Sequence, residues 1–226
     1  YAPLPRLRDL YMEALSHPDV VGIVIGTRPD CVDAEKLDLL AELKEGIGLV
    51  DWYREGFRTP VVKVEFGIES CYDKTLLRVG RGHDVAIAEK AVNMAAERGL
   101  EPGAHFILGL PGETREMILE QCGFISSIPL HSVKFHQLQI VKGTRMEKEF
   151  ASMPQDFLRL SLPDYLDMVV EILERLRPNL YIERVAGEVP PRFVTETQWG
   201  LIRNFQILHL LDDRLKELDT WQGRCF

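Results

Sequence analysis

Apolar residues along this chain follow two alternating patterns, a helical stripe and a short continuous run. Residues 3–17 carry apolar side chains at helical spacing, and residues 20–26 then form an almost uninterrupted apolar run. The same order recurs, with helices predicted over residues 33–46, 84–99, 113–128 and 162–179 and strands over residues 60–69, 103–109 and 132–141. Asp33 is expected to cap the helix that it begins, and Gly46 to lie near the end of that helix.

This alternation predicts an α/β fold. Strands joined by helices of this length are typical of right-handed crossover units around a parallel sheet, which is either doubly wound or rolled into a barrel. In both arrangements ligands bind at the carboxyl ends of the strands. Function is therefore expected in the loops that follow the strands.

The segment after residue 178 is interpreted as a C-terminal extension that covers the sheet, not as a separate domain. It begins with a short strand and a proline-containing loop. A T-x-x-Q capping box from Thr195 to Gln198 then predicts the start of a long helix. The face expected to pack inward carries Trp199, Ile202, Phe205, Leu208, Leu211 and Leu215.

Composition and charge narrow the class of protein. The formal net charge of -8 argues against a general polyanion-binding surface, although a local basic site is compatible with it. No apolar run is long enough for a membrane span, so a cytoplasmic protein without membrane contact is expected. The four cysteines lie far apart in the sequence, which predicts free thiols and no metal site within this chain.

Charged side chains interrupt two of the predicted strands. Lys63 and Glu65 share one face of their strand, and Lys134 and His136 share one face of theirs. Parallel strands are normally apolar on both faces, and burying an unpaired charge is costly. These four candidate substrate-facing residues therefore indicate a wet cavity or a ligand site. The alternative is that Lys63 and Glu65 form a structural pair at a sheet edge or barrel rim.

The strand over residues 103–109 ends in the sequence GLPGE. Gly109 and Gly112 would permit positive φ angles and a close approach of the backbone to a ligand, while Pro111 stiffens the turn. An ordinary strand-to-helix turn also uses glycine, so the motif by itself leaves both interpretations open.

Taken together, the motifs resemble those of the radical S-adenosylmethionine (radical SAM) superfamily. FILGLPGET is similar to the strand and glycine turn beside the adenine in these enzymes, and VEFGIES with DKTLLRVGRGHD is similar to the preceding strand and loop. IGTRPD resembles the end of an earlier strand in the elongator-type and coproporphyrinogen-oxidase-type branches. IGTRPDCV, VKGTRMEKEF and TWQG most resemble the YhcC-like bacterial radical SAM proteins. The resemblance covers nearly the whole chain.

The resemblance implies a set of cofactor-binding residues. It implies that Glu69 hydrogen-bonds the ribose hydroxyls and that Arg81 meets the methionine carboxylate, while Ile107 and Leu108 flank the adenine. Gly26 stands where elongator-type relatives carry Glu, so Thr27 or Arg28 would supply the contact made there. The full set is Thr27, Arg28, Glu69, Ser70, Arg81, His105, Ile107, Gly109 and Gly112.

Two of these residues keep a second interpretation. Arg81 is otherwise a solvated surface arginine, which is the commoner fate of arginine. His105 is otherwise a core histidine whose hydrogen bonds are satisfied within the protein.

The resemblance also implies a fold and an activity. The fold is a partial (β/α)6-type barrel of parallel strands over residues 1–178, lacking its first strand-helix-strand segment, with the extension over residues 179–226. Its relatives hold a [4Fe-4S] cluster with a CxxxCxxC loop, which is not found here and is expected before Tyr1. The intact enzyme would cleave S-adenosylmethionine and use a 5'-deoxyadenosyl radical for hydrogen abstraction, with flavodoxin or ferredoxin as reductant and tRNA as a candidate substrate. This chain alone is expected to be inactive.

Two other functions are compatible with the sequence. One is a cluster-free barrel enzyme in which Glu65 and either His105 or His136 transfer protons on a small metabolite. The other is a non-catalytic scaffold that binds a nucleotide or a partner protein.

Overall fold

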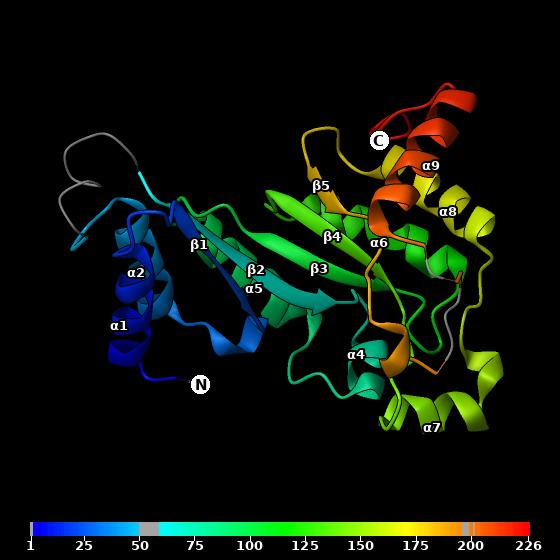
Figure 1. The fold of residues 1–226 in the computed structure, drawn as a ribbon, viewed down its shortest axis with the longest axis horizontal. Coiled ribbons are helices and arrows are strands. Elements are labelled where there is room, and N and C mark those ends of the chain that lie inside the picture. The colour runs from blue at the N-terminus through cyan, green and yellow to red at the C-terminus, as the bar shows by residue number, and fades with distance from the viewer. Residues whose placement is uncertain (1, 50–58, 196–198, 201) are drawn as a thin grey trace.

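The centre of the molecule is one sheet of five parallel strands (Figure 1). The computed structural model describes residues 2–49, 59–195, 199–200 and 202–226. The strands follow one another in sequence order across the sheet and are β1 (Gly22–Thr27), β2 (Val61–Glu69), β3 (Gly103–Leu108), β4 (Ser132–Gln137) and β5 (Tyr181–Arg184). A doubly wound sheet reverses its strand order, whereas a barrel adds each strand beside the last. The order therefore agrees with a partial barrel and confirms the predicted α/β class.

The helices predicted from periodicity are present, with ends that differ by a few residues. They are α1 (Leu4–Leu15), α2 (Ala34–Lys44), α5 (Val85–Ala96), α6 (Arg115–Ser127) and α8 (Leu162–Arg175). As predicted, Asp33 caps α2, accepting a hydrogen bond from the Lys36 amide at 3.0 Å. Gly46 follows this helix with a φ of 75°.

Two short helices are missing from the sequence prediction. They are α4 (Asp73–Val79) and α7 (Arg145–Ser152), and α7 buries no residue. A helix of seven or eight residues spans about two turns, which is too short for an apolar stripe to repeat. Single 3-10 turns lie at Pro29–Cys31, Pro154–Asp156 and Pro191–Phe193.

The two faces of the sheet differ in chemistry. One face is apolar and buried beneath helices, and Figure 1 shows α5 and α6 behind it. Its core includes Phe66, Phe106 and Phe135, each at most 1% exposed, with the rings of Phe106 and Phe135 6.3 Å apart. The opposite face, which we call the inner face, carries Lys63, Glu65, His105, Lys134 and His136. The strand alternation inferred from the sequence thus separates core residues from polar ones.

The C-terminal helix begins later than predicted. It is α9 (Asn204–Glu217), and it packs on α8. Thr195 does not begin it, since the Thr195 amide donates to the Ile140 carbonyl at 2.9 Å. Gln198 lies outside the described residues.

The predicted inward face of this helix is also partly wrong. Leu211 is buried as expected, together with Ile207, but Phe205 is 71% and Leu208 49% exposed. The apolar residues of this segment are compatible with two different inward faces. Contact with α8 decides which face is buried.

The strand β4 is also shorter than predicted. β4 ends at Gln137, and Val141 instead forms an antiparallel bridge with Val194. The loops after β4 and β5 are thereby joined at the carboxyl end of the sheet. Among the helices of the described residues, none has the length and apolarity to cross a membrane.

Candidate functional site

Glu65 is the centre of a polar network on the inner face. Both of its carboxylate oxygens accept hydrogen bonds from the Lys134 ammonium at 2.6 Å, and His105 Nε2 lies 2.9 Å from Glu65 Oε2. The residue paired with Glu65 in β3 is Gly103, where a Cβ atom would lie 3.2 Å from Glu65 Cγ. The register of β2, β3 and β4 thus brings together three residues that are up to 69 positions apart.

The network continues to β5 through a residue that the sequence prediction did not include. Glu183 contacts Lys63 at 2.7 Å and Lys134 at 3.3 Å. Lys63 therefore pairs with Glu183, and not with Glu65 as the structural alternative supposed. Burial raises the pKa of Glu183, but hydrogen bonds from Lys63 and Ser132 and the charges of the two lysines outweigh it and lower the pKa to about 2. A four-residue strand carries little sequence signal, and only the sheet shows that Glu183 faces inward.

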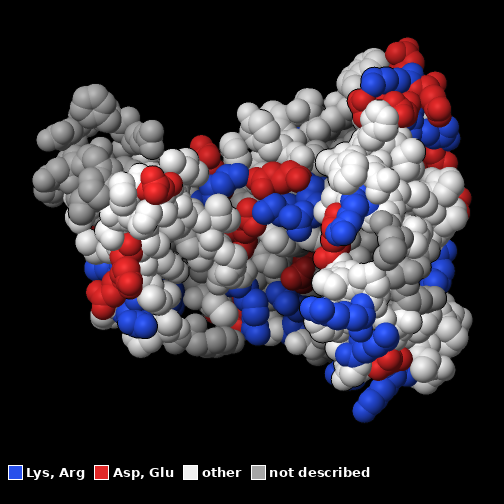
Figure 2. All heavy atoms as spheres, in the orientation of Figure 1, with Lys and Arg blue, Asp and Glu red and all other residues white. Residues whose placement is uncertain are grey.

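His136 lies beside this network. Its ring stacks on that of His105 with centroids 5.5 Å apart, and its Nε2 is buried with no hydrogen-bond partner among the described residues. Burial lowers the pKa of His136 to about 4, assisted by the charges of His105, Arg184 and Lys134, so its ring is neutral near pH 7. Figure 2 shows acidic and basic side chains gathered in the hollow over the middle of the sheet.

The carboxyl end of β2 holds a second polar pair. Glu69 has a φ of 71° at an irregularity in the pairing of β2 with β3, which is an uncommon conformation for a residue other than glycine. Its carboxylate lies 3.4 Å from the Arg81 guanidinium, which also donates to the Gly67 carbonyl at 2.7 Å. Arg81 Nε is buried and has no partner in the described part of the chain. Arg81 is therefore not the solvated surface arginine of the alternative interpretation.

Glycines and burial shape this pair. A Cβ atom on Gly67 would lie 2.7 Å from the Glu69 carboxylate and 3.1 Å from the Arg81 guanidinium. Burial raises the pKa of Glu69, and the positive charge of Arg81 only partly opposes that rise. The pair thus occupies space that only glycine leaves open.

Other predicted cofactor residues hold the loops together. Ser70 is fully buried, and its hydroxyl donates to Glu113 Oε1 at 2.5 Å. Arg28 Nε donates to Asp30 at 2.8 Å, and the Arg28 guanidinium lies where a Cβ on Gly82 would stand. The Thr27 hydroxyl contacts the Arg28 carbonyl at 3.3 Å. These contacts give Ser70, Arg28 and Thr27 partners within the protein.

The glycines of GLPGE adopt the predicted conformation. Gly109 and Gly112 have φ angles of 87° and 88°. The nearest atoms to a Cβ at these positions belong to Leu158 and Arg78 of the same chain. Ile107 is partly exposed, whereas Leu108 is 5% exposed and belongs to the core. The turn therefore requires glycine for its own geometry, and its contact with a ligand stays a prediction.

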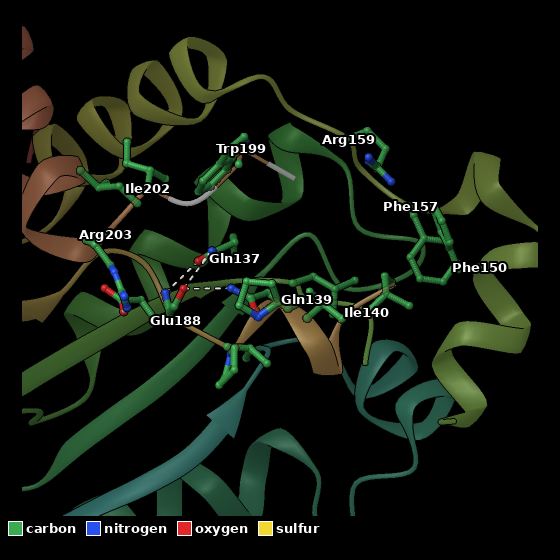
Figure 3. A pocket seen from close by; sticks show the side chains of 18 of the residues that line it. Gln137, Gln139, Ile140, Phe150, Phe157, Arg159, Glu188, Trp199, Ile202 and Arg203 are labelled. Atoms are coloured by element: carbon green, nitrogen blue, oxygen red, sulfur yellow. Dashed lines mark hydrogen bonds and ion pairs between the residues drawn. The ribbon is translucent and has the colours of Figure 1, made fainter. Parts of the chain in front are cut away.

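A cavity of about 630 Å³ opens at the carboxyl ends of β4 and β5. Figure 3 shows Trp199 and Ile202 on one side of this cavity and Phe150 and Phe157 on a different side. Its floor is fixed by Gln137 and Gln139, whose amides donate to the Gly187 carbonyl at 3.0 and 2.9 Å. The sequence prediction missed this cavity because its walls come from segments distant in the chain.

Comparison with known proteins identifies the family. The radical SAM superfamily profile matches residues 1–125, and the Radical_SAM C-terminal domain profile matches residues 130–217. The chain belongs to the radical SAM superfamily. This confirms the resemblance drawn from the sequence motifs.

Individual relatives agree with this membership. Protein MJ0486 of Methanocaldococcus jannaschii is 34% identical over 227 residues, covering 100% of this chain and 66% of that protein. YhcC of Escherichia coli (strain K12) is 33% identical over 187 residues, covering 83% of this chain and 56% of that protein. A more distant match, 25% identical over 77% of this chain and 35% of the relative, is a tRNA uridine(34) acetyltransferase of Dehalococcoides mccartyi. The chain thus spans about two thirds or less of each relative.

A solved structure shows the same fold. The archaeal Methanocaldococcus infernus Elp3 superimposes with a TM-score of 0.69 at 19% identity, over 89% of this chain and 43% of that one. At this identity the likeness extends to the fold alone.

Radical SAM proteins typically bind S-adenosylmethionine and a [4Fe-4S] cluster, and the two groups fit this chain differently. The Glu69 carboxylate can accept hydrogen bonds from hydroxyls, and the buried Arg81 Nε, which has no partner among the described residues, can donate to a carboxylate, so both could contact S-adenosylmethionine. The cluster has no such match, because no group of three His, Cys, Asp or Glu side chains in the described ranges is placed to hold a metal ion. The described cysteines are free and lie in separate segments.

Proposed function

We propose that this chain is the part of a radical SAM enzyme that binds S-adenosylmethionine and faces the substrate, with Glu69 and Arg81 holding the cofactor. The observation that carries the proposal is the pair itself. A glutamate with a left-handed backbone lies at the carboxyl end of a parallel strand, beside an arginine whose buried Nε has no partner within the described ranges. Strain and unsatisfied donors of this kind are uncommon outside functional sites. Bound S-adenosylmethionine would supply a carbon radical for hydrogen abstraction.

Each residue of the pair has a distinct task in this proposal. The planar guanidinium of Arg81 donates two hydrogen bonds to a carboxylate, which a lysine cannot do with the same geometry. The Glu69 oxygens accept from ribose hydroxyls. Arg81 is held in place by its bond to the Gly67 carbonyl and by the preceding Gly80, whose φ is 75°.

The substrate, in this proposal, occupies the inner face and the adjoining cavity. Lys63, Glu65, Lys134 and His136 line that face, and their polar network would orient the substrate and exclude bulk water. The name of the distant acetyltransferase relative supports tRNA as the substrate class. Arg159 and Arg192 line the cavity and supply positive charge in a chain whose net charge is -8, together with Arg203, whose charge is paired with that of Glu188 at 3.2 Å. A flavodoxin or ferredoxin as electron donor stays a prediction.

Calorimetric titration of the chain with S-adenosylmethionine tests the cofactor site. The wild-type chain is expected to bind, and Arg81→Lys to weaken binding about tenfold, or about 1.4 kcal/mol, through loss of the guanidinium fork. Arg98→Lys is the matched control, because the Arg98 side chain is 22% exposed and ion-paired to Asp38, against 25% exposure for Arg81. Absence of binding, or equal loss in both variants, would contradict the proposal.

A second experiment tests the activity and substrate class. The longest natural reading frame, reconstituted anaerobically with iron and sulfide, is expected to form 5'-deoxyadenosine from S-adenosylmethionine under reducing conditions. Binding of total tRNA is expected to weaken at least tenfold between about 50 and 200 mM salt, as phosphate contacts require. No tRNA binding at low salt would remove tRNA as the substrate, whereas no deoxyadenosine would count against the enzyme class.

A further inference from the structure

The two ring nitrogens of His105 have different surroundings. Nε2 lies 2.9 Å from Glu65 Oε2, whereas Nδ1 has no hydrogen-bond partner among the residues that the structure describes. The His105 side chain is 31% exposed, and the Glu65 side chain is 8% exposed. The ring therefore has one nitrogen directed at a buried carboxylate while the other is free to meet a ligand on the inner face.

The charges around Glu65 fix the position of the His105 proton. Burial raises the pKa of Glu65, but hydrogen bonds from Lys134 and His105 outweigh it and lower the pKa, so the carboxylate is ionised at neutral pH. An ionised carboxylate only accepts hydrogen bonds. When the ring carries a single proton, Nε2 must hold it, and Nδ1 then has a bare lone pair.

We propose that His105 is the proton acceptor of the inner face, taking a proton at Nδ1 from an N–H, O–H or ammonium group of a bound substrate. Glu65 and Lys134 are positioning residues, which hold the ring in the required tautomer. The presence of a substrate on this face rests on the proposed function, but the tautomer does not. This role for His105 differs from the cofactor contact implied by the family resemblance.

The proton transfer balances without any further reagent. The proton moves to the Nδ1 lone pair, the substrate atom keeps the electron pair of the broken bond, and no atom changes oxidation state. The imidazolium that forms is paired with the Glu65 carboxylate, and the exposed part of the ring can return the proton to water. The other ionisable groups around this network are Lys63 and Glu69 on β2, Arg81 after α4, Lys134 and His136 on β4, and Glu183 and Arg184 on β5.

Nuclear magnetic resonance of the chain labelled with 15N-histidine tests the tautomer directly. Long-range 1H–15N correlations at alkaline pH are expected to show the His105 proton on Nε2 alone, with His105→Gln used to assign the signals. In Glu65→Gln the ammonium of Lys134, which only donates, takes the amide oxygen and leaves the amide N–H facing Nε2. The His105 proton is then expected to move to Nδ1.

His131 is an internal control in the same spectra. Its side chain is 33% exposed and lies 3.8 Å from the carboxylate of Glu101, so it resembles His105 in exposure and charge but is outside the network. Its signals are expected to stay unchanged in Glu65→Gln.

Reaction with diethyl pyrocarbonate, which attacks bare imidazole nitrogens, tests access to Nδ1. Mass spectrometry is expected to show His105 of the folded wild-type chain modified at a rate similar to His131, and several-fold more slowly in Glu65→Gln. A proton on Nδ1 of the wild-type ring, or a His105 that resists the reagent while His131 reacts, would overturn the proposal even if Glu65→Gln failed to fold. An unchanged tautomer in a folded Glu65→Gln would overturn the role of Glu65. Failure of cofactor binding with the tautomer intact would remove only the proposed function.

Discussion

Glu113 is a buried acid whose ionisation should control the stability of the fold. It is the last residue of GLPGE and is 3% exposed. Ser70 donates to its Oε1 at 2.5 Å, while Oε2 has no hydrogen-bond partner in the described residues. Burial raises the pKa of Glu113 to about 7, and the hydrogen bonds that it accepts oppose this rise only in part. The perturbation we consider is Glu113→Gln, which keeps the shape and removes the titration.

The size and sign of the effect follow from proton linkage. The folded protein retains the Glu113 proton up to about pH 7, whereas the unfolded chain loses it near the ordinary value of 4.5. Between these values the folded state binds more protons, so the free energy of unfolding of the wild type falls as pH rises. The fall is about 1.4 kcal/mol per pH unit, or about 3 kcal/mol over this window. Glu113→Gln lacks this contribution to the pH dependence, because glutamine does not titrate.

Urea unfolding of both proteins from about pH 4 to pH 8 measures the difference. The free energy of unfolding of Glu113→Gln minus that of the wild type is expected to rise by about 3 kcal/mol across this range. Any constant cost of placing an amide beside Ser70 cancels in the slope. Glu116→Gln is the control, because Glu116 is an exposed carboxyl three residues away, in the first turn of α6, whose pKa is lowered, and its difference should not rise. A flat difference for Glu113→Gln would refute the reasoning.

Three further predictions concern the turns and the network. Gly112→Ala places a side chain at a φ of 88° and should destabilise the protein by about 1–2 kcal/mol in urea unfolding. Gly123→Ala is the opposite case, because a Cβ at this position in α6 meets nothing within 4 Å, and it should stabilise the protein by about 0.5–1 kcal/mol. Gly187→Ala would put a Cβ 2.6 Å from Nδ1 of His136 and should displace that ring, seen as a shift of its imidazole resonances; unchanged resonances would contradict the close contact. Glu183→Gln should be less stable than the wild type mainly above pH 4.5, because a carboxyl with a lowered pKa stabilises the fold when it is ionised. The free energies of unfolding of the two proteins should converge as the pH falls toward 2. Parallel curves of stability against pH would show that the ion pairs contribute nothing.

Much of the polar site could be predicted from strand alternation, but its pairing could not. Lys63 and Glu65 were expected to share a face, and they do, yet each has its ionic partner on another strand. Glu183 completes the network from a strand of four residues, in which alternation is too brief to read. The cavity beside Gln139 was missed for a similar reason, since segments after β4, β5 and α7 form it together.

The sequence by itself determined the order of the strands and of the longer helices, the apolar and polar faces of the sheet, the positive φ of the GLPGE glycines and the radical SAM family. These depend on local spacing and on the conformational range of single residues, which are properties of short segments. Only the tertiary structure decided the partners of Glu65, the contact of Glu69 with Arg81 and the rotation of α9. Those depend on strand register and helix packing, because the free energy of a charge pair or a buried face is set by atoms that are distant in the chain.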